Sequence, residues 1–280
     1  MKIKNKISNK NINIQNSTFK DKCKLVFIKL KNLLTSSIYP DNCNCIICDK
    51  EIPIGSKYGL CDYCYNKLPF NKQMYCVKCG VPIENEATYC LMCQNNGRHF
   101  DFVRSCFVYE NEIKKLILNL KFHNCKWLAK YFADMLFDCY NLYDLNAELI
   151  IPVPISKERE KQRGYNQTMM FAKPLAEKLN IPIATDTILK VKDVSPQTKL
   201  SGKQRHENVK GAYKVFNTTS VKGKRVLIID DILTTGSTMD EVAKQLKIAG
   251  ASAVYGLVLA SPKYKLLTDN LDAQKVDTIW

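Results

Sequence analysis

The segment from Val226 to Thr238 constrains the fold most, because it passes from an uninterrupted apolar run through two acids into small hydroxylated residues. An apolar run of this kind is typical of a parallel strand that is buried on both faces. Beyond it, Val242, Leu246 and Ala249 recur at helical spacing and indicate an amphipathic helix. With the other alternating strand and helix signals, the segment predicts an α/β fold, a parallel sheet flanked by helices.

The loop of this unit is suited to hold a phosphate group, because its amides converge where the helix dipole favours an anion. Hydroxyl donors and one glycine, which lets a ligand approach the backbone, make up the loop: Thr234, Thr235, Gly236, Ser237 and Thr238. It matches neither the P-loop, which needs a Lys-Ser/Thr pair after its last glycine, nor the pattern G-x-G-x-x-G. The alternative interpretation is an ordinary strand-to-helix turn whose acids cap the helix.

Asp230 and Asp231 distinguish this loop from the commoner phosphate loops. Two carboxylates repel a bare phosphate, but they suit a ligand that also brings sugar hydroxyls or a Mg²⁺ ion. Two acids followed by Thr-Thr-Gly-Ser-Thr resemble the phosphoribosyl-pyrophosphate (PRPP) loop of type I phosphoribosyltransferases. The resemblance implies that Asp230 and Asp231 are catalytic residues that hold the ribose hydroxyls, directly or through the metal shell. It also implies that residues 234–238 hold the 5-phosphate.

Eight of the thirteen cysteines form four Cys-x₂-Cys pairs: Cys45, Cys48, Cys61, Cys64, Cys76, Cys79, Cys90 and Cys93. Each pair turns two sulfurs toward one ion, and two pairs complete the tetrahedral S₄ site that Zn²⁺ prefers. We therefore predict two structural Zn²⁺ ions, with the pairs grouped in sequence order. Interleaved grouping and an iron–sulfur cluster are the alternatives. Cys43 is close enough to the first pair to act as a substitute ligand.

The cysteine segment also carries a family resemblance. Leu60-Cys61-x₂-Cys64 and Cys76-x₂-Cys79-Gly80-x-Pro82 resemble the double zinc ribbon that opens ComF-family proteins, and the resemblance continues to about residue 260. It implies a type I phosphoribosyltransferase-like sheet preceded by a small double zinc ribbon. The expected order is a basic, disordered tail (1–40), the double zinc ribbon (41–97), the phosphoribosyltransferase-like domain (98–262) and a C-terminal tail (263–280).

A basic run follows the short apolar strand Leu149–Pro154. At this point the ComF family has Pro-Val-Pro, a basic run and then Arg-Gly-aromatic-Asn-Gln, and the chain has all three. A basic loop after a parallel strand is placed to hold a pyrophosphate, because Arg supplies paired donors for phosphate oxygens. The expected ligand-binding residues are Ser156, Lys157, Arg159 and Arg163. The alternative is a solvated basic helix start.

Residues 196–213 form a polar segment with proline and glycine that resembles the loop closing over PRPP in phosphoribosyltransferases. We expect Lys199, Lys203 and Arg205 to reach the leaving pyrophosphate. Val194 departs from the family pattern, which usually has Thr there.

Two apolar stripes at helical spacing precede the basic loop. The first comprises Ile113, Leu116, Ile117 and Leu120, and the second comprises Leu128, Tyr131, Phe132, Met135 and Leu136. We interpret both as the core-facing sides of helices.

The formal net charge of +15 is unevenly distributed. Residues 1–40 hold nine lysines and one aspartate, whereas acidic and basic residues balance over residues 41–100. A basic tail attracts nucleic acid or an anionic membrane, and the favoured alternative is a merely solvated tail. No apolar stretch approaches the length of a membrane span, so we expect a cytoplasmic protein.

The expected function is binding of PRPP with Mg²⁺ together with a part in DNA uptake (natural competence) or DNA handling, because ComF relatives are linked with competence. The expected partners are PRPP or another ligand containing ribose 5-phosphate, single-stranded DNA and the DNA-uptake machinery. The alternative is an active phosphoribosyltransferase with an unidentified acceptor in nucleotide metabolism. Purine-salvage enzymes of the hypoxanthine-guanine type carry an Asp at the position of Thr234, which argues against that substrate.

Overall fold

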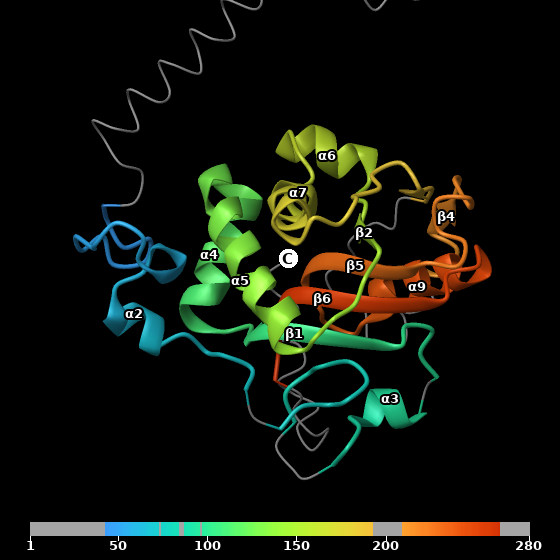
Figure 1. Cartoon of the computed structure of the whole chain (residues 1–280), viewed down its shortest axis with the longest axis horizontal. Coiled ribbons are helices and arrows are strands. Elements are labelled where there is room, and N and C mark those ends of the chain that lie inside the picture. The colour runs from blue at the N-terminus through green and yellow to red at the C-terminus, as the bar shows by residue number, and fades with distance from the viewer. Residues whose placement is uncertain (1–42, 73, 84–86, 96, 193–208, 264–280) are drawn as a thin grey trace, which may run out of the picture. The chain divides into compact units, whose positions relative to one another are not determined.

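The computed structural model describes residues 43–72, 74–83, 87–95, 97–192 and 209–263 (Figure 1). The chain divides into two compact units, Met1–Cys61 and Asp62–Trp280. The tail expected for residues 1–40, most of the tail expected for 263–280 and the three expected lid cations lie outside the described residues. Those cations are Lys199, Lys203 and Arg205.

In the first unit, the chain turns sharply at its first cysteine pair. The Cys45 amide donates to the Lys50 carbonyl at 2.8 Å, and the Asp49 amide donates to the Cys45 carbonyl at 2.9 Å. Asp49 has a left-handed φ of 59°, which lets the chain reverse directly after Cys48. A short 3₁₀ turn, η1 (Lys57–Gly59), precedes Cys61.

The second unit is built on a four-stranded sheet in the order β1-β6-β5-β2, in which every neighbouring pair is parallel (Figure 1). The strands are β1 (Phe102–Val108), β2 (Leu149–Pro152), β5 (Arg225–Ile232) and β6 (Ala253–Ser261). A separate antiparallel pair consists of β3 (Ile188–Lys190) and β4 (Tyr213–Val215). The helices are α2 (Asp62–Asn66), α3 (Leu91–Asn95), α4 (Asn111–Phe122), η2 (Lys126–Leu128), α5 (Ala129–Leu142), α6 (Lys157–Arg163), α7 (Gln167–Leu179) and α9 (Ser237–Ile248). The predicted α/β fold with a parallel sheet is confirmed.

β5 is an inner strand of this sheet and is buried on both faces. Residues 226–229 are completely buried, as the apolar run predicts. Because side chains alternate along a strand, Val226 and Ile228 share one face, and they belong to the same core as the apolar side of α9. On the other face lie α5 and α7 (Figure 1), where the rings of Phe132 and Phe171 meet edge to face at 6.1 Å. The loop after β5 therefore emerges between two helical layers.

Both predicted apolar stripes form the buried sides of helices. Ile117 and Leu120 of α4 and Leu136 of α5 are 1% exposed or less. One detail differs, because Leu128 belongs to η2 and α5 begins one residue later. Within the described part of the chain, no helix has both the length and the apolar character needed to cross a membrane.

The second cysteine segment shares the hydrophobic core of the sheet. Cys76 and Cys90 lie in the same buried cluster as Val103 of β1. Gly80 has a left-handed φ of 69°, and a Cβ atom there would lie only 2.6 Å from the Val103 carbonyl oxygen. The Val103 amide also donates to the Lys78 carbonyl at 2.8 Å. The segment is thus packed directly against β1.

Candidate functional site

The predicted phosphate loop lies at the carboxyl end of β5 and leads into α9, which begins at Ser237. Gly236 adopts a left-handed φ of 75°, which glycine takes without strain. The Thr235 hydroxyl lies 2.9 Å from the Ser237 hydroxyl, the Asp240 amide donates to the Gly236 carbonyl at 2.8 Å, and Thr234 is exposed. The loop therefore turns through its glycine and presents the N-terminus of a long helix, an arrangement that favours an anion.

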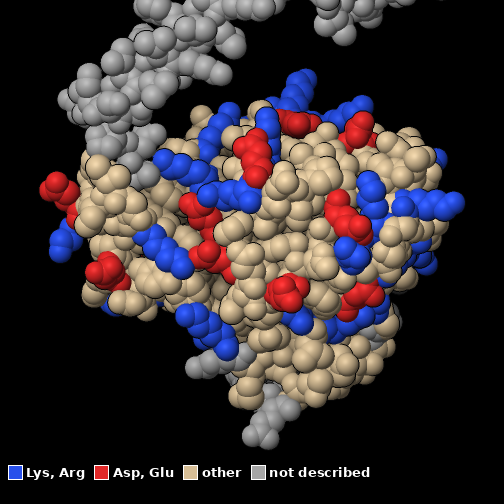
Figure 2. Space-filling model, viewed as in Figure 1, with Lys and Arg blue, Asp and Glu red and all other residues tan. Residues whose placement is uncertain are grey.

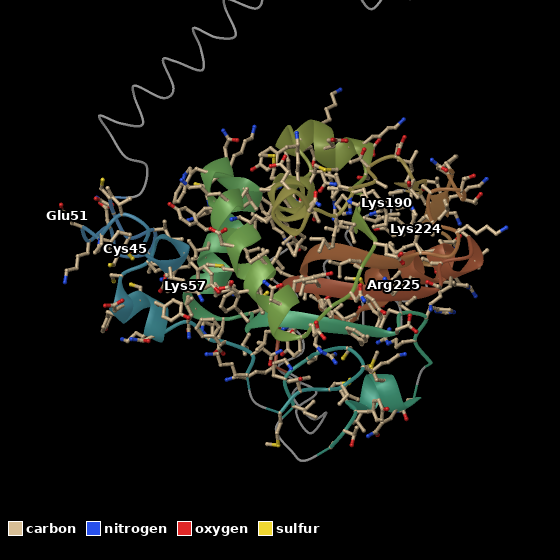
Figure 3. All side chains as sticks on the ribbon, in the orientation of Figure 1. Cys45, Glu51, Lys57, Lys190, Lys224 and Arg225 are labelled. Atoms are coloured by element: carbon tan, nitrogen blue, oxygen red, sulfur yellow. The ribbon has the colours of Figure 1, made fainter. Side chains whose placement is uncertain are left out.

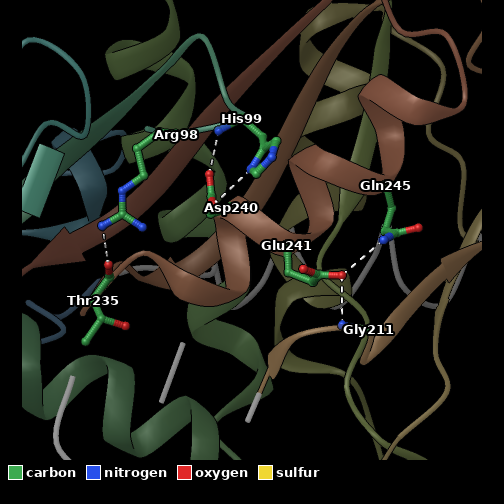
Figure 4. A network of polar contacts seen from close by, with 7 residues as sticks. All are labelled: Arg98, His99, Gly211, Thr235, Asp240, Glu241 and Gln245. Atoms are coloured by element: carbon green, nitrogen blue, oxygen red, sulfur yellow. Dashed lines mark hydrogen bonds and ion pairs between the residues drawn. The ribbon is translucent and has the colours of Figure 1, made fainter. Parts of the chain in front are cut away.

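Arg98 and His99 fasten this loop and its helix to the segment that follows the second set of cysteines (Figure 4). Nη2 of Arg98 donates to the Thr235 carbonyl at 2.9 Å. The His99 amide donates to Oδ1 of Asp240 at 2.6 Å, and its ring Nδ1 lies 3.1 Å from Oδ2. Asp240 is 2% exposed, whereas the His99 side chain is 46% exposed, so the contacts are only partly buried. The cysteine segment and the phosphate loop are therefore directly connected.

Glu241 connects α9 with a further segment (Figure 4). Its Oε1 accepts hydrogen bonds from the Gly211 amide and from Nε2 of Gln245, both at 3.0 Å. Gly211 lies near the end of the segment 196–213 that is expected to close over the ligand. Asp240, in the first turn of α9, suits the helix dipole. Asp240 and Glu241 also bond two other segments to the helix.

Asp231 ends the apolar strand in a buried position, and both oxygens of its carboxylate have partners. Nζ of Lys121, on α4, lies 3.1 Å from Oδ1, and Nε2 of Gln167, on α7, donates to Oδ2 at 3.0 Å. The side chains of Lys121 and Asp231 are only 7% and 8% exposed. Removing one member of a buried pair leaves an uncompensated charge, so the two residues depend on each other.

Asp230 differs from its neighbour in its electrostatic environment. Its Oδ1 accepts a hydrogen bond from the Asp231 amide at 2.8 Å. Burial, followed by the negative charge of Asp231, raises the pKa of Asp230 to about 7, although the Asp231 amide and Lys121 oppose the shift. Two adjacent acids in such unlike environments are typical of a functional site.

A pocket of about 640 Å³ contains both carboxylates. Its lining also includes Thr238 from the phosphate loop and Arg159 and Arg163 from α6. Lys190, labelled in Figure 3, reaches the same pocket from β3. The structure therefore brings five of the predicted site residues to one cavity.

Two other predicted residues face elsewhere. Ser156 and Lys157 line a neighbouring pocket of about 890 Å³. Ser156 caps α6, accepting a hydrogen bond from the Arg159 amide at 3.4 Å. Arg163 Nη1 donates to Oε1 of Gln167 at 2.8 Å, and the same Gln167 contacts the carboxylate pair through Asp231. Arg159 and Arg163 therefore line the pocket of the carboxylates, whereas Ser156 and Lys157 line the neighbouring one.

The eight predicted zinc ligands form two clusters of four sulfur atoms, each with its atoms within 4.8 Å of one another. The clusters are Cys45, Cys48, Cys61 and Cys64, and Cys76, Cys79, Cys90 and Cys93. The grouping in sequence order is thus confirmed, and Cys43 is not a member. Four convergent thiols with no other donor type fit Zn²⁺.

At Cys45 the local backbone favours the thiolate form that a metal needs. Burial opposes ionisation of Cys45, but amide hydrogen bonds at Cys48 and Cys61 lower the pKa of its thiol to about 6. Both segments use the same turn, because the Gly80 amide donates to the Cys76 carbonyl at 2.7 Å just as Asp49 does to Cys45. The two cysteine segments are therefore structural repeats.

The comparisons with known proteins agree with this architecture. Residues 34–94 match the double zinc ribbon domain, and residues 166–279 match the phosphoribosyl transferase domain. The chain is 32% identical over 227 residues to competence protein F of Haemophilus influenzae, an alignment that covers 78% of this chain and 98% of that protein. The chain belongs to the ComF family.

Two further ComF-family relatives extend the comparison. The DNA utilization protein YhgH of Escherichia coli is 27% identical over 219 residues, which cover 75% of this chain and 93% of that protein. Competence protein ComFC of Bacillus subtilis is 25% identical over 228 residues, which cover 75% and 90%.

Three polar residues of the site were not singled out from the sequence. Lys121 follows Ile117 by one helical turn, so a cation on the predicted core side of α4 was the signal for a buried partner. Gln167 is the last residue of the Arg-Gly-aromatic-Asn-Gln pattern, which gives it no separate role. Arg98 gave no signal, because its partner Thr235 lies 137 residues further along the chain.

Proposed function

We propose that this ComF-family protein binds PRPP, or a related ligand containing ribose 5-phosphate, in the pocket at the carboxyl end of β5 and acts in DNA uptake or DNA handling. The observation that carries the first part is the meeting of Asp230, Asp231, Thr238, Arg159 and Arg163 in one cavity. The carboxylates suit ribose hydroxyls, the helix N-terminus suits a 5-phosphate, and the arginines suit a pyrophosphate.

The residues also allow a specific role for a metal. Mg²⁺ prefers oxygen ligands and commonly binds through one or two carboxylates and substrate phosphates. Both oxygens of Asp231 already have partners, so Asp230 is the carboxylate that would hold the ion. Bound Mg²⁺ would supply positive charge to the pyrophosphate of PRPP.

The chain's own residues suit the departure of pyrophosphate from the ribose. Arg159 and Arg163 would hold its oxygens and stabilise the charge that develops on them. Asp230 and Asp231 would fix the ribose by its hydroxyls, so that the reacting carbon is held in place while the bond to pyrophosphate breaks. The acceptor remains to be identified, and Thr234 at the loop argues against a hypoxanthine-guanine type of substrate.

The DNA part of the proposal is supported by the names of the relatives, which are a DNA utilization protein and two competence proteins. We propose single-stranded DNA and the uptake machinery as partners. A catalytically active phosphoribosyltransferase in nucleotide metabolism is the second candidate, because the carboxylates and the arginines that such chemistry needs share one pocket.

Calorimetry with PRPP and Mg²⁺ tests the ligand. The wild type should bind, and Asp230→Asn should bind about ten- to a hundredfold more weakly, because a hydrogen bond to a charged group is worth about 1.5–3 kcal/mol. Asp134→Asn on α5, which alters an exposed pair with Lys178 of α7, is the matched control. Absence of heat from the wild type at millimolar PRPP would refute PRPP binding.

A transformation assay then tests whether the role in DNA uptake depends on the ligand. Asp230→Asn should be introduced into a competent host in place of its own ComF-family protein. Loss of transformation together with loss of PRPP binding favours a role that needs the ligand, whereas normal transformation favours a DNA-handling factor with a vestigial site. Binding of the wild type to single-stranded DNA should weaken steeply with salt, because phosphate contacts release counterions.

A further inference from the structure

We propose that Lys121 is a resident counter-cation of the ribose site, which lets the protein bind ribose 5-phosphate through its carboxylate pair without Mg²⁺. The proposal rests on the proposed function, because it concerns the same pocket. It assigns the positive charge at the carboxylates to the protein itself and leaves Mg²⁺ to the pyrophosphate.

The first observation is the position of the ammonium group. Lys121 lies near the C-terminal end of α4, and its Nζ is 3.1 Å from Oδ1 of Asp231. Both residues line the pocket, although each side chain is less than a tenth exposed. The ammonium group therefore belongs to the wall of the ligand site.

The second observation is that the surrounding residues hold this part of α4 in place. The Tyr165 hydroxyl donates to the carbonyl of Leu120, the residue before Lys121. Tyr165 lies in the loop between Arg163 and Gln167, both of which line the pocket. Gln167 also bonds the second oxygen of Asp231, so two helices converge on one carboxylate. Asp231 is thus held by a cation on one oxygen and an amide on the other.

Stability alone gives no reason for this arrangement. Well-packed apolar residues often replace a buried ion pair without loss, and sometimes with a gain in stability. A phosphorylated sugar, however, meets two adjacent acids here, and an unneutralised pair would repel its phosphate. Lys121 lowers that repulsion before any ligand arrives.

Thermal melting of the ligand-free, zinc-loaded protein gives the first test, in Mg²⁺-free buffer without a chelator and in millimolar Mg²⁺. Wild type should melt at the same temperature in both, whereas Lys121→Met should melt several degrees lower without Mg²⁺ and recover part of the loss with it. The double variant Lys121→Met/Asp231→Asn should melt near wild type and ignore Mg²⁺. Lys115→Met, which removes an exposed lysine paired with Glu112 on the same helix, is the control.

Calorimetry with ribose 5-phosphate, which lacks a pyrophosphate, gives the second test. Wild type should bind equally in Mg²⁺-free buffer and in Mg²⁺, Lys121→Met should bind at least about tenfold more weakly without Mg²⁺ and recover with it, and Lys121→Arg should resemble wild type. A merely structural lysine would weaken binding equally with and without the metal.

Two outcomes overturn the proposal: wild-type binding of ribose 5-phosphate that disappears when Mg²⁺ is left out, or a Lys121→Met variant whose response to Mg²⁺ equals that of wild type. If wild type binds ribose 5-phosphate under neither condition, the proposed function fails, and the melting curves still decide the role of Lys121. If Lys121→Met does not fold, the double variant and Lys121→Arg carry the comparison: a double variant that binds ribose 5-phosphate only when Mg²⁺ is present overturns the proposal, because it has no unpaired charge at position 231 for the metal to neutralise.

Discussion

At the scale of single residues, two neighbouring acids perform different tasks. Asp231 is bonded on both oxygens, whereas Asp230 lines the pocket with a raised pKa. An acid whose charge the fold resists is retained where a ligand or a metal needs that charge, so stability and function oppose each other at this position.

Asp230→Asn should therefore stabilise the ligand-free protein while it weakens ligand binding. We expect a gain of about 1–2 kcal/mol near pH 8. The pKa of Asp230 is raised in the fold, so its ionisation destabilises the folded state as the pH rises toward about 7. The gain should accordingly shrink as the pH falls from about 7 toward about 4. Chemical denaturation of the zinc-loaded protein in Mg²⁺-free buffer at several pH values measures it, and a gain that is constant with pH would contradict the assignment.

Gly80→Ala should disrupt the second zinc site. Its Cβ would lie 2.6 Å from the Val103 carbonyl oxygen at a left-handed φ, so backbone must move. We expect a loss of more than about 3 kcal/mol in stability and reduced zinc content. Gly223→Ala is the control, since Gly223 also has a left-handed φ of 76° but has no atom within 4 Å of the added Cβ. The control should lose only about 1 kcal/mol.

At the scale of elements, the phosphate loop depends on contacts that come from outside its own strand and helix. Arg98 bonds the loop, His99 bonds α9, and both follow Cys93 within a few residues. Through Arg98 and His99, the conformation of the phosphate loop is thus linked to the second metal cluster.

Cys76→Ser should consequently lower PRPP affinity as well as zinc content. The ribbon would loosen and release Arg98 and His99, and we expect a loss of about tenfold in affinity. Asp240→Ala should reproduce the loss of affinity with normal zinc content, and Cys125→Ser, a thiol outside both clusters, should change neither. Zinc analysis and calorimetry on the same samples are the measurements, and unchanged affinity in Asp240→Ala would exclude the coupling.

The strands and helices could be predicted from the sequence, whereas the side-chain contacts between them could not. The apolar run before Asp230 and the stripe around Ile117 fix a strand and a helix by local periodicity alone. The Cys-x₂-Cys spacing likewise predicts the eight ligands, because it is a local geometric requirement, whereas the structure was needed to decide between grouping in sequence order and interleaved grouping. The Lys121–Asp231 and His99–Asp240 contacts instead join residues more than a hundred positions apart, and no local pattern encodes such a distance.

At the scale of the whole molecule, positively and negatively charged side chains are mixed on the visible face. On the face that Figure 2 shows, Lys and Arg are interspersed with Asp and Glu. The sequence of residues 1–40, in contrast, holds nine lysines and one aspartate. A basic excess of this kind can contribute to nucleic-acid binding, and the favoured alternative, a merely solvated tail, predicts no contribution.

Deleting residues 1–40 should leave the fold and PRPP binding intact and should lower the affinity for single-stranded DNA. The slope of binding against salt should also become shallower, because fewer counterions are released. Circular dichroism, calorimetry and a salt titration of DNA binding check the three expectations. A deletion variant that fails to fold would show that the segment is part of the fold.

The core that the second cysteine segment shares with β1 limits how ComF-family chains can change over evolutionary time. Cys76 and Cys90 are buried together with Val103, and Gly80 leaves no room for a side chain against that strand. A lineage that lost these zinc ligands would expose apolar surface on the sheet, unless larger apolar side chains arose at the same time and covered that surface. Descendants without the cysteines should therefore carry compensating apolar substitutions around Val103. Selection would then act on this ribbon and the sheet as one heritable unit.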